Sequence, residues 1–375
     1  MIYLDNAATT NYKPQCVIDA VVECMTKYPF NPNRSGSKQA LELQQKLYDA
    51  RKKLSLLYNN DSENHVVFTS GCTQALNLAI LGNAKKGHII VTCTEHNSVL
   101  RPVMQLKRKG YADVSVITPN EQGLVTVESV QNAMKPNTYM LCVSHSSNVT
   151  GQYQNIEELG AFARKRNIVM LADCAQSAGY VPLDMKRCSV DLVAVAGHKG
   201  LHGIQGAGAL IFNNRAVPRP ITFGGTGTES HLHYQPSTVP DCLESGTLPT
   251  PAIISMSAGI DYWLNNWKAN GDNVAATQKI ILDGLNAIPD VKVYSKENLS
   301  GVIAFNVKNK DSAEVADVLS QKYDVAVRGG LQCAPLMHKW LGTYEQGAVR
   351  ASVSCVTTKE ECLTLLEAVE QIAKE

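Results

Sequence analysis

Seven short apolar segments alternate with amphipathic segments between residues 66 and 212, and this pattern restricts the fold more than any other feature of the sequence. The apolar segments have the length and composition of buried β-strands; they are residues 66–68, 88–92, 114–118, 139–143, 169–172, 192–196 and 209–212. Helical patterns separate most of them, at residues 73–81, 98–108, 126–134 and 156–166. Strands that alternate with helices indicate βαβ units, so we predict an α/β fold with a mainly parallel seven-stranded sheet.

The sequence on either side of this block has a different character. Leu43, Leu47, Leu54 and Leu57 have the spacing of one helix face, and they predict a helix packed on the main domain. Residues 223–251 are rich in Gly, Pro and Thr and carry few strand or helix signals. Because a loop of this length is uncommon inside a domain, we expect this segment to be functional.

The last third of the chain mixes the two kinds of element. Helical patterns cover residues 253–267, 273–287 and 312–322, and a final one starts at residue 358. Strand patterns cover residues 291–294, 302–307, 325–328 and 349–354. We therefore predict two domains: an N-terminal segment with a large domain over residues 1–250, and a smaller α+β domain over residues 251–375.

The charge of the chain provides no overall attraction to nucleic acid or to an anionic membrane. Lys and Arg total 35 and Asp and Glu total 34, so the net charge is +1. No apolar run reaches the ~18 residues of a membrane helix, and the first residues lack the parts of a signal peptide. We expect a soluble cytoplasmic protein with neither a nucleic-acid nor a membrane partner.

The cysteines do not form the pattern of a disulfide framework or of a zinc site. There are 11 of them, an odd number, without a C-x-x-C pair. His231 and His233 flank Leu232, but no second pair of potential ligands accompanies them. We therefore expect no metal site.

Five polar loops each follow a predicted strand, at residues 69–73, 94–98, 147–151, 171–176 and 196–200. Loops at the carboxyl ends of parallel strands collect at one edge of the sheet, so we expect them to lie together. Each loop alone has a plain structural explanation. Thr73 and His96 suit helix caps, Asp173 suits a cap or a partner for a buried cation, and Lys199 suits an exposed turn.

Taken together, the five loops contain the parts that hold pyridoxal phosphate. Gly71 and Thr73 open a helix, whose free N–H groups suit a phosphate. Lys199 follows an apolar strand, and a desolvated Lys amine is nucleophilic and forms Schiff bases. Asp173 is placed to keep a pyridinium nitrogen protonated, which makes the cofactor ring an electron sink.

These motifs resemble those of the class V aminotransferase family of fold-type I pyridoxal phosphate enzymes, in particular its cysteine desulfurase and selenocysteine lyase branch. The resemblance covers nearly the whole chain and includes all five loops. The other matching motifs are YLDNAATT at residues 3–10, ESGT at 244–247, RGGLQCAP at 328–335 and VRAS at 349–352. The fold-type I architecture that this implies has a large and a small domain.

The resemblance implies a role for each cofactor residue. Lys199 would carry pyridoxal 5'-phosphate as a Schiff base, and His96 would stack on the ring. Asp173 would pair with the ring nitrogen, and Gln176 would contact the phenolic oxygen. The residues that would bind the phosphate are Cys72 through its backbone, Thr73 and His198.

The resemblance also implies a substrate site and a partner subunit. Asn148 would lie beside the cofactor and substrate, and Arg350 would bind the amino acid carboxylate with its planar fork. Ala7 and Arg328 complete the predicted substrate site. Thr228, or alternatively Thr226, would reach the phosphate in a partner subunit, so we expect a homodimer.

Cys333 is the second centre of the predicted chemistry. It lies in a Gly-rich turn ahead of a helix that starts near Pro335, and both the helix N-terminus and Arg328 favour a thiolate there. The resemblance implies that Cys333 takes sulfur from L-cysteine, becomes a persulfide and leaves L-alanine, with Lys199 as the general base and His96 beside it. A sulfur acceptor protein or a small thiol would then take the sulfur.

Two departures from the family pattern keep alternatives open. Ala196 stands where the family commonly has Ser or Thr, so one hydroxyl to the phosphate is missing. Gln332 stands where the family commonly has His, and Gln cannot shuttle a proton near neutral pH. L-selenocysteine needs less help because a selenol is more acidic, so a selenocysteine lyase is the nearest alternative. A β-lyase, an epimerase, an aminotransferase and a non-catalytic sulfur carrier are more distant ones.

Overall fold

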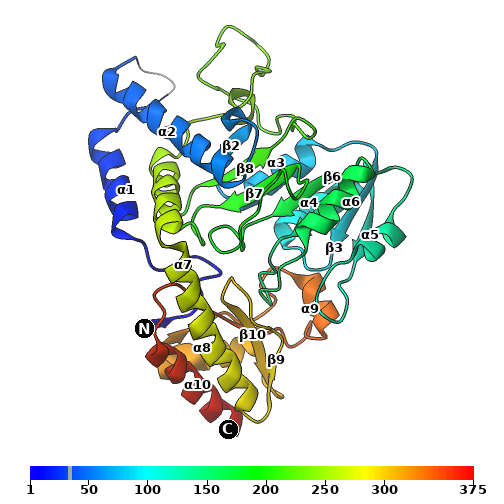
Figure 1. Cartoon of the computed structure of the whole chain (residues 1–375), viewed down its shortest axis with the longest axis vertical. Helices are drawn as coiled ribbons and strands as arrows, with labels where there is room; N and C mark the ends of the chain where they lie inside the picture. Colours follow the sequence, from blue (N-terminus) through cyan, green and yellow to red (C-terminus); the bar gives the residue numbers. More distant parts are fainter. Residues whose placement is uncertain (33–35) are drawn as a thin grey trace.

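The seven predicted strands form a single sheet in the computed structural model, which describes residues 1–32 and 36–375 (Figure 1). The strands are β2 (Val66–Thr69), β3 (Gly87–Thr92), β4 (Ala112–Ile117), β5 (Thr138–Ser144), β6 (Val169–Asp173), β7 (Leu192–Ala196) and β8 (Gly208–Phe212). Their order is β2-β8-β7-β6-β5-β3-β4. Strand β8 runs antiparallel to both of its neighbours, and the other pairs are parallel. The prediction of a mainly parallel seven-stranded sheet is confirmed.

Helices cover both faces of this sheet because successive strand residues point to opposite sides. In β7, Leu192 and Ala194 face one apolar core, whereas Val193 and Val195 face the other. The first core is closed by α3 (Cys72–Gly82) and α4 (Asn97–Arg108). The second is closed by α2 (Lys38–Leu57), α5 (Val127–Ala133), α6 (Ile156–Lys165) and the first half of α7. Helices α3, α4, α5 and α6 follow the predicted boundaries within one residue, and α2 contains the predicted leucine face.

Helix α7 (Thr250–Ala287) is one continuous helix of 38 residues that connects the two ends of the molecule (Figure 1). The prediction of two helices, at residues 253–267 and 273–287, is wrong. Gly271 lies between them, and a helical Gly costs only about 1 kcal/mol. Packing at both ends outweighs that cost, because Ile260 is buried in one core and Ile281 in another. Helix α1 (Gln15–Lys27), which packs along α7, was not predicted from the sequence.

The smaller part of the molecule surrounds an antiparallel sheet of order β12-β10-β9. Its elements are β9 (Val291–Val293), β10 (Val302–Val307), β12 (Val349–Ser352), α8 (Ser312–Tyr323), α9 (Pro335–Leu341) and α10 (Lys359–Lys374). Strand β1 (Ile2–Tyr3) pairs in parallel with β11 (Val325–Ala326), so the first residues contact this part. The division into two domains near residue 250 stays a prediction.

A buried ion pair attaches the segment before α7 to the sheet. This segment contains the short 3₁₀ helix η2 (Asp241–Leu243) and the ESGT motif; a similar helix, η1 (Glu63–His65), precedes β2. Glu244 pairs with Arg51 of α2 and accepts a hydrogen bond from the backbone N–H of Phe68 at 2.5 Å.

None of the described helices combines the length and the apolar character that crossing a lipid bilayer requires.

Candidate active site

A cavity of about 230 Å³ lies at the carboxyl edge of the sheet, where the five predicted loops meet. The structure brings together there all of the cofactor-binding residues predicted from sequence except Thr228. Those lining the cavity are Cys72, Thr73, His96, Asn148, Asp173, Gln176, His198 and Lys199. Ala196, which departs from the family pattern, also lines it.

Lys199 lies three positions after the last residue of β7 and lines the cavity. Burial lowers the pKa of Lys199, and the positive charges of Arg350 and Arg328 lower it further, while Asp173 opposes them. A larger share of the amine is therefore neutral than for an exposed Lys. Neutrality is what both Schiff-base formation and proton abstraction require.

Asp173 ends β6 and is 4% exposed. Its Oδ1 accepts a hydrogen bond from the backbone N–H of Ala175 at 2.9 Å and lies 3.5 Å from Cys72 Sγ. These contacts fix the carboxylate at the floor of the cavity. Burial and the charge of Asp173 raise the pKa of Cys72 well above its usual range, so this thiol stays protonated. A protonated Cys72 thiol fits the predicted role of Cys72, in which only its backbone binds the cofactor phosphate.

The His96 ring is oriented by its own helix. His96 is the N-cap residue of α4, and its Nδ1 accepts a hydrogen bond from the backbone N–H of Ser98 at 3.0 Å. The proton of the neutral ring is therefore on Nε2. Burial lowers the pKa of His96, which favours this neutral form. A neutral, fixed ring suits stacking on an aromatic cofactor.

The start of α3 forms the anion-binding end of the cavity. The first N–H groups of a helix have no partner within it, and α3 begins at Cys72. Gly208 of β8 permits this placement, because a Cβ there would lie 2.6 Å from the carbonyl carbon of Gly71. The Thr73 hydroxyl is 2.8 Å from Ser98 Oγ. Burial and Lys199 lower the pKa of His198 to about 4, so its ring is neutral.

These residues fit pyridoxal phosphate. The cavity offers a helix N-terminus for a phosphate, a carboxylate for a ring nitrogen and a desolvated amine for an aldehyde, all at one edge of one sheet. Eight buried side-chain polar atoms find no hydrogen-bond partner among residues 1–32 and 36–375, and two of them belong to predicted site residues: Asn148 Oδ1, in the cavity lining, and Arg350 Nε. Within the same residues, no group of three or more His, Cys, Asp or Glu is arranged to hold a metal ion.

Of the predicted substrate residues, Asn148 lines this cavity, whereas Ala7, Arg328 and Arg350 are not part of its lining. Arg350 is 1% exposed; its Nη2 is 2.6 Å from Asp5 Oδ1, and its Nη1 donates to the Asn148 carbonyl at 2.9 Å. The carbonyl of Ala7 accepts a hydrogen bond from Gln176 Nε2 at 2.9 Å. The pairing of Arg350 with Asp5 was not foreseen from the sequence, although Asp5 belongs to a matching motif.

Cys333 lies between β11 and α9, half-buried, close to the cavity residue His96. Its carbonyl oxygen accepts a hydrogen bond from the backbone N–H of Asn97 at 2.8 Å. Its sulfur is 3.7 Å from Arg328 Nη2, so a guanidinium faces the thiol. The side chain of Gln332 points elsewhere, since its Nε2 donates to the Ala348 carbonyl at 2.8 Å.

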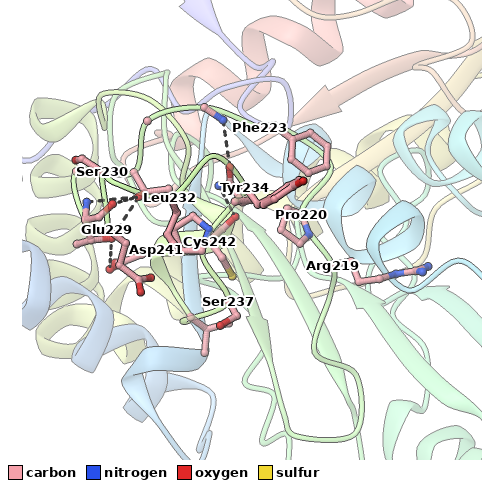
Figure 2. Close-up of a pocket in the computed structure, with 18 of the residues that line it drawn as sticks. Arg219, Pro220, Phe223, Glu229, Ser230, Leu232, Tyr234, Ser237, Asp241 and Cys242 are labelled. Atoms are coloured by element: carbon pink, nitrogen blue, oxygen red, sulfur yellow. Dashed lines mark hydrogen bonds between the residues drawn. The ribbon is translucent and has the colours of Figure 1, made fainter.

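Thr228 is the predicted site residue that the structure keeps away from the cavity of its own chain. It lines a separate hollow of about 1640 Å³, and its hydroxyl donates to Asp241 Oδ2 at 3.1 Å. Figure 2 shows Phe223, Leu232 and Tyr234 among the residues around this hollow. The segment that carries Thr228 projects at the top of Figure 1, between β8 and α7. Its predicted contact with a partner subunit stays a prediction.

Glu95 is a buried acidic residue next to the site, and it was not singled out from the sequence. It directly precedes His96 and is 1% exposed. Its Oε1 accepts hydrogen bonds from Thr92 Oγ1 at 2.7 Å and from the backbone N–H of Ser144 at 2.8 Å. Burial raises the pKa of Glu95 to about 8. The sequence feature that could have identified Glu95 is an acidic residue placed just after an apolar strand.

The sequence profile of the family Aminotransferase class-V matches residues 2–365. The chain belongs to the class-V aminotransferase family. Enzymes of this family depend on pyridoxal phosphate, so the predicted family and cofactor are confirmed. A probable cysteine desulfurase of Methanothermobacter thermautotrophicus is 31% identical, and the match covers 99% of this chain and 94% of that protein. The cysteine desulfurase IscS of Shewanella baltica is 30% identical, with 99% and 92% covered.

Solved structures of class-V relatives show the same fold. The apo structure of the cysteine desulfurase from Thermococcus onnurineus NA1 has a TM-score of 0.91 at 29% identity, covering 100% of this chain and 94% of that chain. The cysteine desulfurase CsdA (S-sulfonic acid) from Escherichia coli has a TM-score of 0.89 at 26% identity, with 99% and 94% covered. The predicted fold type is therefore confirmed.

Proposed function

We propose that this chain is a pyridoxal phosphate-dependent cysteine desulfurase that converts L-cysteine to L-alanine and places the sulfur on Cys333. The observation that carries the proposal is the position of Cys333: the backbone N–H next to His96 binds its carbonyl oxygen, and a guanidinium faces its sulfur. Full-length similarity to named cysteine desulfurases supports the same activity.

Each cavity residue has a task in this reaction. The start of α3, Thr73 and His198 would hold the cofactor phosphate, and Asp173 would hold its ring nitrogen. The bound cofactor supplies an electron-withdrawing ring that acidifies the Cα–H bond of the substrate. The neutral Lys199 amine accepts the Cα proton as general base. Arg350 would bind the substrate carboxylate in place of, or beside, Asp5.

Cys333 performs the sulfur transfer. Its thiolate attacks the substrate sulfur, so that an S–S bond forms while the substrate Cβ–S bond breaks. The electron pair of the broken bond goes to Cβ, which takes a proton and becomes the methyl group of alanine. The Arg328 guanidinium, 3.7 Å from the sulfur, stabilises the attacking thiolate. A sulfur acceptor protein or a small thiol then takes the persulfide sulfur.

Alanine formation from L-cysteine tests this proposal. Cys333→Ala should abolish it while leaving the yellow colour of the holoenzyme intact, and mass spectrometry should find the persulfide on the Cys333 peptide of the native protein. Cys16→Ala is the matched control, because Cys16 is exposed and lies on α1. Pyruvate in place of alanine, or full activity of Cys333→Ala on cysteine, would contradict the proposal.

A selenocysteine lyase is the second candidate, and the orientation of Gln332 favours it. Because this side chain is bonded to Ala348 rather than to Cys333, residue 332 offers no proton transfer to the thiol. A selenol is acidic enough to react without such help. Turnover of L-selenocysteine that persists in Cys333→Ala, together with negligible turnover of L-cysteine, would identify this activity.

We also propose that the active unit is a homodimer. Tyr234 is 87% exposed and Phe223 is 73% exposed on the projecting segment, and Thr228 lies on the same segment. Sedimentation should give twice the chain mass of 40.7 kDa. Mixed dimers test the role of Thr228 directly: one subunit carries Thr228→Ala and Lys199→Ala, and the other subunit is native. Thr228→Ala should then weaken cofactor binding in the cavity of the native subunit, which still carries Lys199.

A further inference from the structure

The turn that presents Cys333 has an unfavourable backbone. Gln332 has φ 41° and Cys333 has φ 58°, so two consecutive residues with a Cβ adopt the left-handed region. Neither residue type favours this conformation, and consecutive residues in it are rare. Such a turn persists only where surrounding contacts hold it.

The large part of the molecule holds the main chain of this turn. Asn148 Nδ2 donates to the carbonyl oxygen of Gln332 at 2.6 Å. The backbone N–H of Asn97 donates to the carbonyl oxygen of Cys333 at 2.8 Å. Asn148 lines the cavity and Asn97 follows the cavity residue His96, so these bonds hold the turn next to the active site.

The smaller part of the molecule holds the Gln332 side chain. This side chain belongs to a residue that is 2% exposed, and its Nε2 donates to the Ala348 carbonyl at 2.8 Å. Because a carbonyl only accepts, the amide nitrogen must face Ala348 and Oε1 must face the other way. There Oε1 lies 2.8 Å from Nε2 of His338.

His338 is itself fixed in one orientation. It is fully buried, and its Nδ1 lies 2.8 Å from Thr343 Oγ1. Since Gln332 Oε1 only accepts, His338 Nε2 carries the proton, and Nδ1 accepts from the Thr343 hydroxyl. Burial lowers the pKa of His338 to about 4, which keeps this single neutral form at physiological pH.

We propose that Gln332 and His338 are positioning residues for Cys333. Thr343 orients His338, His338 holds the Gln332 amide, and Gln332 joins the smaller part to Asn148 across the reactive turn. The turn is thereby kept in the left-handed conformation that directs Cys333 Sγ toward Arg328. Gln332 thus acts through geometry at a position where the family commonly has an imidazole. The expected effect on catalysis rests on the proposed function, whereas the positioning of Cys333 does not depend on it.

The test compares variants that break the contact between His338 and Gln332 with a variant that preserves it. His338→Leu removes the donor to Gln332, whereas His338→Gln supplies an amide N–H close to the position of Nε2. Thr343→Val removes only the hydroxyl that orients the ring, and it serves if His338→Leu does not fold. His88→Leu is the matched control: His88 is also fully buried and has polar partners on both ring nitrogens, but it lies in β3.

The first measurement is the rate at which iodoacetamide alkylates Cys333 in the holoenzyme, followed by peptide mass spectrometry with Cys16 as the internal reference. The loss of one buried hydrogen bond predicts about a fivefold to tenfold change in the rate at Cys333 in His338→Leu and Thr343→Val, and near-native rates in His338→Gln and His88→Leu. Unchanged Cys333 labelling in both His338→Leu and Thr343→Val would overturn the inference, as would equal changes in His88→Leu.

The second measurement separates positioning from substrate binding. With L-cysteine, His338→Leu should lower kcat about tenfold and leave KM within about twofold, because the turn does not hold the substrate. The absorbance of the bound cofactor should stay unchanged. If the native protein releases no alanine, the proposed function fails; the labelling result still decides whether His338 positions Cys333.

Discussion

The Arg350 guanidinium is held by the Asp5 carboxylate, with Nη2 and Oδ1 2.6 Å apart, and it is almost completely buried. This contact joins the first residues of the chain to β12, beside the active-site cavity. Burial lowers the pKa of Arg350, and the charge of Asp5 counteracts that effect. Asp5 therefore stabilises a buried cation that the proposed reaction uses for the substrate carboxylate.

Removing Asp5 should destabilise the protein because the buried Arg350 charge loses its partner. We expect Asp5→Ala to lower the free energy of unfolding by about 3 kcal/mol, in the range for breaking one side of a buried pair. Asp5→Asn should lose less, since its amide oxygen still accepts a hydrogen bond. Urea unfolding measures both. Equal stability of Asp5→Ala and the native protein would show that Asp5 does not stabilise the buried Arg350 charge.

Glu95 should make the protein less stable as the pH rises. The native state raises the pKa of Glu95 from 4.5 to about 8, so between these values the native state binds a proton that the unfolded chain has lost. The free energy of unfolding therefore falls across this window, by ~1.4 kcal/mol per pH unit at most. Its stabilising effect is complete below pH 4.5 and lost above pH 8.

The variant Glu95→Gln tests this dependence because an amide cannot ionise and its oxygen still accepts from Ser144. Relative to the native protein, we expect Glu95→Gln to gain on the order of 2–3 kcal/mol between about pH 5.5 and about pH 8. Thermal unfolding at both pH values gives the difference. Glu367→Gln, at an exposed position on α10, is the control and should gain nothing. A stability difference that does not vary with pH would rule out a buried neutral Glu95.

The sheet and the cavity were predictable for one physical reason. Buried parallel strands are apolar throughout, so their ends are visible in the sequence, and the loops that follow them must share an edge. That is why the pattern of the sequence alone places Lys199 and Asp173 together, although they are 26 positions apart in the chain. The roles of these residues stay predictions.

Contacts between distant side chains could not be predicted in the same way. Strand β1 has two residues, too few for a pattern, and it is fixed only by its pairing with β11. The contact of Gln332 with His338 depends on a left-handed turn, and the residue types in that turn do not predict its conformation. The continuity of α7 across Gly271 depends on packing at both of its ends, which local propensity does not contain.

Two glycines should respond oppositely to alanine. At Gly208 the new Cβ would lie 2.6 Å from the Gly71 carbonyl carbon and 2.8 Å from the Cys72 nitrogen, so the start of α3 must shift. We expect Gly208→Ala to weaken cofactor binding at least tenfold, roughly the effect of ~1.4 kcal/mol. At Gly271 nothing lies within 4 Å, and Gly271→Ala should stabilise α7 by about 0.5–1 kcal/mol. Cofactor titration and thermal unfolding measure the two effects.

Ala196 should accept a hydroxyl that improves cofactor binding. It is 1% exposed, lines the cavity and lies opposite Gly208 in the sheet, next to the start of α3. Ala196→Ser adds a single oxygen on the cavity side, where it can donate to the cofactor phosphate. A hydrogen bond to a charged group contributes about 1.5–3 kcal/mol, so the cofactor should dissociate at least about tenfold more slowly. Cofactor release into excess apoprotein gives this rate; Ala196→Val, which adds bulk without a hydroxyl, should release it faster than the native protein. If Ser and Val behave alike, the effect is steric and the phosphate does not lie at Ala196.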